Sequence, residues 1–245
     1  MKRNISLIFS LLFIFSACQK EEVEEYVSGA RLNFNNDYKV ENVPTIRCGF
    51  TDSDYLNKTT EITDSIEVVV MGLSTNTDRT FYCTTAPADS LYSMPVTVAE
   101  SYIIPKNTYS TFIKFSIKAP GNFGKANKTY IQFDQSKNTG VFEPGNKEAQ
   151  QCIIDCIYTL LPIEWNTDAW GKFSNGKYKF MIDHFQKLHD DIPPYRQEQE
   201  EIYDAYQKYK AAGNPPIMDD STPAKEIEFK TLITLLNPVA PHITE

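Results

Sequence analysis

The chain has 245 residues and a formal net charge of −8 at pH 7, because 32 Asp and Glu residues outnumber 24 Lys and Arg residues. This acidic balance argues against nucleic acid and against anionic lipid headgroups as partners. With 41% hydrophobic and 13% aromatic residues, the chain is not disordered, and its length suffices for one sizeable domain or two small ones.

The first 17 residues predict a signal peptide that is removed from the mature protein. A cationic start and an apolar run over 5–15 precede a small residue at the cut, and the segment is too short to span a membrane comfortably. The sequence Phe15-Ser16-Ala17-Cys18 resembles the bacterial lipobox, and this resemblance implies that Cys18 carries lipid and anchors the protein in a membrane. The alternative is an ordinary secreted protein with an incidental Cys. No later run is long and apolar enough to predict a transmembrane helix.

Residues 18–28 predict a lipidated, flexible tether that also contains an export signal. Lys20, Glu21 and Glu22 follow the lipidated Cys directly, and they resemble the export signal of Bacteroidetes surface lipoproteins. That resemblance implies display on the outer face of the outer membrane. The alternative is a polar tether without any address.

Residues 29–160 predict an immunoglobulin-like antiparallel β-sandwich, so the chain is expected to be mostly β. Short β-type runs recur between turns that contain Asn, Gly and Pro. In the clearest run, 111–118, apolar Ile113, Phe115 and Ile117 alternate with mostly polar residues. The other predicted strands are 30–34, 65–71, 79–83, 94–98, 128–133 and 151–158.

Residues 161–245 predict a small α+β unit that follows the sandwich. The segment 177–182 is expected to be a strand, and 194–212 is expected to be a helix. Pro194 suits the first turn of that helix, and Gly213 followed by Asn214-Pro215 ends it. Acidic residues lie early in this segment and Lys residues late, which complements the helix dipole.

Four cysteines remain when Cys18 is acylated. On a strand, Cys152 and Cys156 share a face about 13 Å apart, which is too far for a disulfide. We therefore expect buried thiols that act as small hydrophobes. A bridge between Cys48 and Cys83 stays open, because nothing in the sequence decides it.

No catalytic, cofactor or metal motif is found. His184 and His189 are five residues apart, which lacks the i, i+4 spacing of a helical metal pair. Asp52-Ser53-Asp54 begins like a calcium loop, but Leu56 and Thr63 stand where oxygen ligands are expected, so a solvated loop is predicted. A pair of carboxylates for glycoside hydrolysis leaves no spacing signature and stays open.

The two tryptophans, Trp165 and Trp170, are the candidate ligand-binding residues, because aromatic rings stack on sugars. A packing role in the core is the favoured interpretation. Three segments resemble the loose Asp-Ser/Thr sequon for O-glycosylation of Bacteroidetes exported proteins, which makes Ser65, Ser90 and Ser221 candidate sites. Ser90 and Ser221 lie in turn-like surroundings and are the better candidates.

Several segments occur in a characteristic order. Asp64-Ser65-Ile66-Glu67-Val68 leads to Asp78-Arg79-Thr80-Phe81, Phe142-Glu143-Pro144-Gly145 precedes the last sandwich strand, and Trp165 is followed by Trp170-Gly171-Lys172-Phe173-Ser174. Over Gly29 to about Gly213, this order and spacing resemble an uncharacterised Bacteroidetes lipoprotein family, known only as a domain of unknown function. The resemblance implies neighbours of the SusC/SusD-like type, which import glycans or peptides, and it assigns no catalytic residue.

Three classes of function follow. The favoured one is a non-enzymatic surface accessory that binds a glycan or peptide, or docks on a SusC/SusD-like pair. A surface hydrolase of glycan or peptide comes second. An adhesin or structural surface protein comes third.

Overall fold

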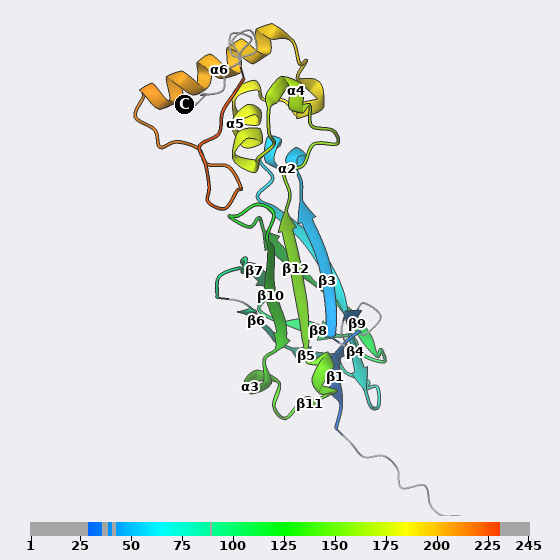
Figure 1. The fold of residues 1–245 in the computed structure, drawn as a ribbon. Helices are drawn as coiled ribbons and strands as arrows, with labels where there is room; N and C mark the ends of the chain where they lie inside the picture. The colour runs from blue at the N-terminus through cyan, green and yellow to red at the C-terminus, as the bar shows by residue number, and fades with distance from the viewer. Residues whose placement is uncertain (1–28, 36–38, 41–42, 89, 231–245) are drawn as a thin grey trace, which may run out of the picture.

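The computed structural model describes residues 29–35, 39–40, 43–88 and 90–230. The molecule is elongated, with β-strands over most of its length and most of the helices gathered at one end (Figure 1). The prediction of a mostly β chain is confirmed. The signal peptide, Cys18 and the residues Lys20, Glu21 and Glu22 lie outside the described residues.

One five-stranded sheet has the order β11-β1-β4-β9-β7. Its longest pairing joins β4 and β9 in antiparallel register from Glu61↔Lys118 to Val69↔Ser110. The strand bounds are β1 Arg31–Phe34, β4 Glu61–Met71, β7 Val96–Val98, β9 Ser110–Lys118 and β11 Glu143–Pro144.

A second five-stranded sheet has the order β2-β3-β12-β10-β6. A short ribbon of β5 (Arg79–Phe81) and β8 (Tyr102–Ile104) stands beside the two sheets. The bounds of the second sheet are β2 Lys39–Val40, β3 Val43–Phe50, β6 Cys83–Pro87, β10 Ala126–Phe133 and β12 Gln151–Tyr158.

The two sheets share one hydrophobic core, which we call the β core. Alternate residues of β4 and β9 turn inward, as a period of two requires, and meet inward residues of β10 and β12. Phe34 and Phe133 stack within it with ring centroids 4.3 Å apart. The inward residues of these four strands include Ile66, Val68, Val70, Ile113, Phe115, Ile117, Ile131, Ile154 and Cys156.

The expectation of a purely antiparallel arrangement is wrong at two pairings. β1 pairs with β11 in parallel, and β3 pairs with β12 in parallel with Cys156 opposite Cys48. Parallel neighbours need a long connection, and four of the five strands of the first sheet (β4, β7, β9 and β11) lie between β3 and β12 in the sequence. Local alternation carries no information on such a pairing.

The predicted strand at 79–83 is two strands, β5 and β6, separated at Tyr82. The Asn138 side chain accepts a hydrogen bond from Tyr82 N at 2.9 Å and donates one to Tyr82 O at 3.0 Å. This side chain takes the place of a strand neighbour and interrupts the ladder. Strand β3, which the sequence analysis did not predict, has an irregular burial pattern and contains Pro44 and Gly49.

The helices lie mainly beyond β12. They are α4 (Thr167–Trp170), α5 (Asn175–Phe185), the 3-10 turn η3 (His189–Asp191) and α6 (Arg196–Ala211). We call residues 165–230 the cap. Helix α6 confirms the helix predicted at 194–212, and its Ile202 and Tyr206 are buried. Short elements elsewhere are α2 (Asp52–Leu56), α3 (Gln135–Asn138) and the 3-10 turn η2 (Lys147–Ala149).

The strand predicted at 177–182 is wrong, because this segment lies inside helix α5. Ser174 caps the helix by accepting a hydrogen bond from Lys177 N at 3.2 Å. Tyr178, Met181 and Ile182 are buried at the i, i+3, i+4 spacing of one helical face. The alternation of Lys and aromatic residues in Lys177-Tyr178-Lys179-Phe180 is compatible with a strand. Four residues, however, are too few to distinguish the two-residue period of a strand from the 3.6-residue period of a helix.

Helix α2 joins the sheets to the cap. It follows β3 directly, and the reciprocal hydrogen bonds of Thr51 and Asp54 form a capping box at its start. The loop predicted at 52–54 is therefore a helix. Asp52 accepts a hydrogen bond from the Tyr178 hydroxyl at 2.8 Å, and the Tyr55 hydroxyl donates to Asp183 at 2.7 Å. The division of the chain at 160 stays a prediction.

Removing the buried hydroxyl in Tyr178→Phe should destabilise the protein by ~2 kcal/mol, because Asp52 loses a donor and His189 N loses its acceptor. Urea unfolding measures the change. Tyr55→Phe is the matched control: it removes a hydrogen bond to Asp183 in an exposed setting and should cost less than ~1 kcal/mol. Equal losses in the two variants would show that burial does not strengthen the Tyr178 contact.

Candidate ligand-binding groove

A groove of about 370 Å³ lies in the cap between the α4–α5 connection and the C-terminal part of the described chain. One wall is Gly171, Lys172, Phe173 and Ser174, with Lys177 of α5 at its base. The other wall belongs to residues 217–230, which we call the strap. A second hollow of about 320 Å³ lies between the strap and α6, where Tyr203, Tyr206 and Lys210 line it. Glu226, Ile227, Glu228 and Lys230 of the strap line both hollows.

The strap is a folded turn held against α5 and α6. Ile227 N donates to Ile217 O at 2.9 Å, and Asp219 N donates to Lys225 O. Ile227 and Phe229 are buried in a second apolar cluster, the cap core, with Trp170 and Met181. A Cβ at Gly176 would come within 2.8 Å of Met218 O, so the absence of a side chain there lets the strap lie directly on α5.

Lys177 is the buried cation of the groove and is only 3% exposed. Its Nζ donates to Trp170 O and Lys172 O, both at 3.0 Å, and lies 5.5 Å from the centroid of the Phe229 ring. These carbonyls follow the end of α4, where a cation complements the helix dipole. Burial nevertheless disfavours the charged form and lowers the Lys177 pKa to about 8.

Two strap carboxylates are held in their charged form. Asp219 accepts hydrogen bonds from the Ser221 hydroxyl and Lys225 N, which lower its pKa to about 2, and it pairs with Lys172 at 3.7 Å. Glu226 pairs with Lys210 at 3.0 Å and accepts from the Tyr206 hydroxyl at 3.1 Å, and both contacts lower its pKa. Neither group is a proton donor near neutral pH.

This arrangement suits binding better than hydrolysis. A glycoside hydrolase needs one carboxylic acid whose pKa is raised, so that it can protonate the leaving group. The two strap carboxylates show the opposite shift. A groove with fixed charges of both signs can instead orient a polar ligand.

A larger hollow, about 500 Å³, lies elsewhere, between the edge strands β6 and β7. Its lining consists of small, apolar and hydroxyl side chains, among them Pro87, Met94 and Thr129, and contains no ionisable residue. We place the candidate site in the cap groove because charges and aromatic rings converge there.

The two tryptophans lie beneath the groove. Trp170 is 1% exposed and belongs to the cap core, so its ring is not available to stack on a sugar. Trp165 is half-buried, donates from Nε1 to Gly171 O at 2.7 Å, and packs on Phe173 and His189. Both side chains support the loop that forms one groove wall, which agrees with the favoured packing role.

The two histidines do not come together. His184 on α5 contacts Glu201 of α6 at 2.9 Å. His189 is buried in η3, where it stacks on Trp165 and contacts Asp190 at 3.1 Å. Across the part of the chain that the structure describes, no group of three or more His, Cys, Asp or Glu side chains is placed to hold a metal ion.

The candidate glycosylation sites lie in three settings. Ser65 lies within β4 opposite Lys114. Ser90 is exposed in a turn-like segment. Ser221 is half-buried, and its hydroxyl donates to Asp219 and to Pro223 O. Ser90 is therefore the most accessible of the three.

Cys48, Cys83, Cys152 and Cys156 are all free thiols. Cys152 and Cys156 are fully buried in the β core, as predicted. Burial raises the pKa of Cys83 and of Cys152 to about 12, so these two thiols stay protonated. The bridge between Cys48 and Cys83 that the sequence left open is not formed.

Lys177 and the strap were missed by the sequence analysis. Lys177 lies four residues before Met181, so a helical interpretation of 175–185 would have placed a Lys on the buried face. A buried Lys is rare unless it has partners, so a Lys on the buried face of this helix could have indicated a polar site.

None of the described helices has the length and apolar character needed to cross a membrane. No family model and no curated protein matches the chain. Among solved structures, a Bacteroides ovatus protein of unknown function is similar at 11% identity and TM-score 0.37, covering 52% of this chain and 44% of its own. The chain thus spans less than half the length of that neighbour.

Two further structures are similar over the same extent. The apo form of the Calx CBD1 domain shares 12% identity at TM-score 0.30, covering 54% of this chain and 98% of its own. EndoBT-3987 of Bacteroides thetaiotamicron, solved with a Man5GlcNAc product, shares 12% identity at TM-score 0.34, covering 52% of this chain and 30% of its own. Likeness at this level assigns no activity, and the family resemblance stays a prediction.

The ionisation of Lys177 should make stability depend on pH. Its pKa is about 8 in the folded protein and about 10.4 in an unfolded chain. Between these values the unfolded chain holds a proton that the folded protein has released, so the free energy of unfolding rises with pH. Relative to Lys177→Met, the natural protein should gain about 1–2 kcal/mol between pH 8 and 9.5, measured by urea unfolding.

All other titrating groups are common to the two proteins, so their difference isolates Lys177. Lys208→Met, at an exposed position on α6, is the control and should keep the pH dependence of the natural protein. Parallel stability curves for the natural protein and Lys177→Met would contradict a lowered pKa at Lys177.

Proposed function

We propose that this protein is a lipid-anchored, surface-exposed accessory of the outer membrane, and that its cap groove binds a ligand for an uptake system. The observation that carries the proposal is a groove with fixed charges of both signs, formed by Lys172, Lys177, Asp219 and Glu226. Asp219 and Glu226 of this groove have lowered pKa values and therefore do not supply the proton donor that hydrolysis would need.

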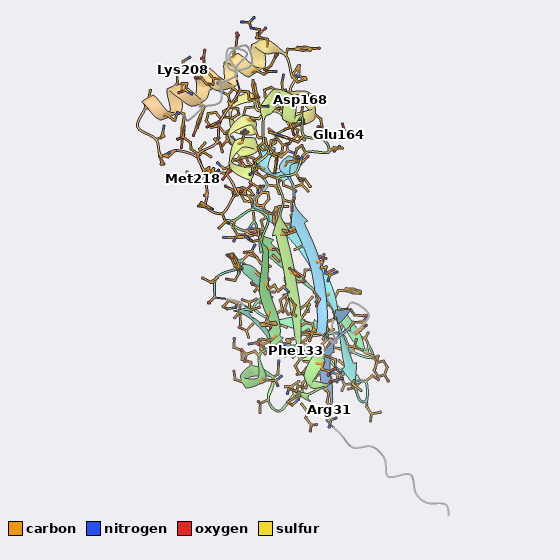
Figure 2. All side chains as sticks on the ribbon, in the orientation of Figure 1. Arg31, Phe133, Glu164, Asp168, Lys208 and Met218 are labelled. Atoms are coloured by element: carbon orange, nitrogen blue, oxygen red, sulfur yellow. The ribbon has the colours of Figure 1, made fainter. Side chains whose placement is uncertain are left out.

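The position of the groove supports display. Figure 2 shows Arg31, near the start of the described chain, at one end of the molecule, and Met218 and Lys208 of the cap at the other. A chain anchored through Cys18 would be tied to the membrane from the Arg31 end. The two sheets then act as a spacer that holds the groove away from the membrane.

The charges favour a peptide over a neutral glycan. A peptide offers ammonium, carboxylate and backbone groups, which complement a surface that alternates Lys and acidic side chains. The exposed Lys225 and Glu228 extend the groove's rim. A neutral sugar offers no charged group to this surface, and the ring of Trp170 is buried and cannot stack on it.

The finer fold class belongs to the same proposal. We propose that the two sheets, which share one core, form an immunoglobulin-like sandwich, a common support for binding loops. We propose a SusC/SusD-like pair as the partner that receives the ligand. Recovery of such a pair with the detergent-solubilised protein would support this part of the proposal, and recovery of the protein alone would count against it.

The groove should bind peptides weakly and electrostatically. Titration with a mixed casein hydrolysate should shift NMR signals of groove residues, and about 0.5 M salt should abolish the shifts, because exposed charges are screened within a few ångströms at that ionic strength. The double variant Lys172→Ala, Lys225→Ala should bind at least about tenfold more weakly, as expected for two lost ionic contacts.

Lys208→Ala is the matched control, because it removes an exposed Lys from the same cap outside both hollows. Neutral oligosaccharides in place of peptides should leave the spectrum unchanged. Binding that survives in the double variant would remove the groove from the proposal. Turnover of a peptide or glycan by the purified protein would favour the hydrolase instead.

The lipid anchor and the export signal can be tested separately in living cells. Cys18→Ala should abolish labelling with radioactive palmitate. Replacing Lys20, Glu21 and Glu22 with Ala should leave labelling intact but protect the protein from protease added to whole cells, since the anchor remains and the address is lost. Labelling of Cys18→Ala, or equal protease sensitivity of the triple variant and the natural protein, would refute the respective prediction.

A further inference from the structure

Two cysteines far apart in the sequence face each other across neighbouring strands. Cys48 of β3 and Cys156 of β12 are direct partners in the parallel register of the second sheet. Neighbouring strands lie about 4.8 Å apart, and disulfides join residues whose Cα atoms are about 4.4–6.8 Å apart. The register therefore meets the first geometric requirement for a cross-link.

The side chains also meet. Both residues pack on the β core, and the two thiols are close enough for each to shift the pKa of the other. Cys156 is fully buried, whereas Cys48 is half-buried near the edge of the sheet. One sulfur of the pair is thus within reach of a reagent in solution.

The other two thiols have no such partner in the register. Cys83 lies opposite Phe133, and Cys152 lies opposite Ile131 in β10. Cys152 and Cys156 are separated by four residues of one strand, about 13 Å. Among the described cysteines, direct pairing singles out Cys48 and Cys156.

We infer that Cys48 and Cys156 form a reversible disulfide that clamps β3 to β12. The Cys48 thiolate attacks an external disulfide and releases one thiol, and the Cys156 thiolate then displaces the second. Two protein thiols and one external disulfide thereby become one protein disulfide and two external thiols. The external oxidant is a small disulfide of the glutathione type.

The closeness of the two thiols favours the first deprotonation, at Cys156. The S–H group of one cysteine stabilises the thiolate of the other, which lowers the pKa of Cys156, and the shared proton raises the pKa of Cys48. The Cys48 thiol must therefore pass its proton to the neighbouring Cys156 thiolate before the Cys48 sulfur attacks. The accessible sulfur, Cys48, is the one that meets the oxidant.

The clamp would act where the sheet meets the cap. Each cysteine lies two residues before its strand ends, at Phe50 and at Tyr158, which are themselves partners. Strand β3 leads directly into α2, and β12 leads into the connection to α4. A disulfide at this place would hold together the two strands that support the cap. It would also close a loop of more than one hundred residues, which lowers the entropy of the unfolded chain and so stabilises the folded protein.

The test uses the full chain, treated with oxidised glutathione without denaturant. Peptide mapping should then find Cys48 linked to Cys156, while Cys83 and Cys152 are alkylated as free thiols after unfolding. The midpoint of urea unfolding should rise on oxidation and return to its starting value with dithiothreitol. Cys48→Ala should abolish both the link and the shift in midpoint.

Cys152→Ala is the matched control, because it removes an equally buried thiol from the same strand and should leave the link intact. A glutathione adduct that persists on Cys48, or four free thiols after treatment, would overturn the inference. The test is done in vitro, so its failure would leave the proposed groove and anchor untouched.

Discussion

The hydroxyl of Tyr178 joins the two parts of this molecule. It donates to Asp52, which belongs to the short helix after β3, and it accepts from the backbone of His189. The ring is fully buried and belongs to the β core, as does Ile182, whereas Met181 of the same helix belongs to the cap core. Helix α5 is therefore a wall shared by the β core and the cap core.

This shared wall determines where the groove forms. With Tyr178 fixed against Asp52, the preceding residue, Lys177, must point to the other side of the first helical turn. There its amine meets the carbonyls that follow α4, and the strap closes over it through Phe229. The position of the groove therefore depends on how α5 is anchored. Asp52 of α2, although distant in the sequence, contributes to the placement of Lys177 through its contact with Tyr178.

The sequence was informative where one local period governed burial. Strand 111–118 and helix 194–212 were predicted because each buries a single regular face, and Trp170 was assigned to packing for its size. The prediction failed at 177–182, where Tyr178 and Met181 serve two different cores and the apolar stripe is broken by a buried Lys. Strand β3 was missed because its burial pattern is irregular. Its parallel pairing with β12 could not be predicted either, because that pairing depends on the whole fold. The groove depends on helix α5 and on the elements that anchor it, so the spacing of residues in the sequence could not predict which residues line it.

The cost of burying Lys177 bears on what the groove can do. Leu or Met at this position would fill the space without the desolvation that lowers the Lys pKa to about 8, and would leave the carbonyls of Trp170 and Lys172 without this donor. The Lys therefore rigidifies the loop that carries Lys172 and Phe173. Around it, Asp219 and Glu226 are held by hydrogen bonds from within the cap. Charges that are already fixed lose little entropy when a ligand arrives, whereas catalysis by proton transfer would need groups whose charge can change near neutral pH. Asp219 and Glu226 do not meet that condition, and the Lys177 amine is engaged by two carbonyls, so these groups favour the proposed role in recognition.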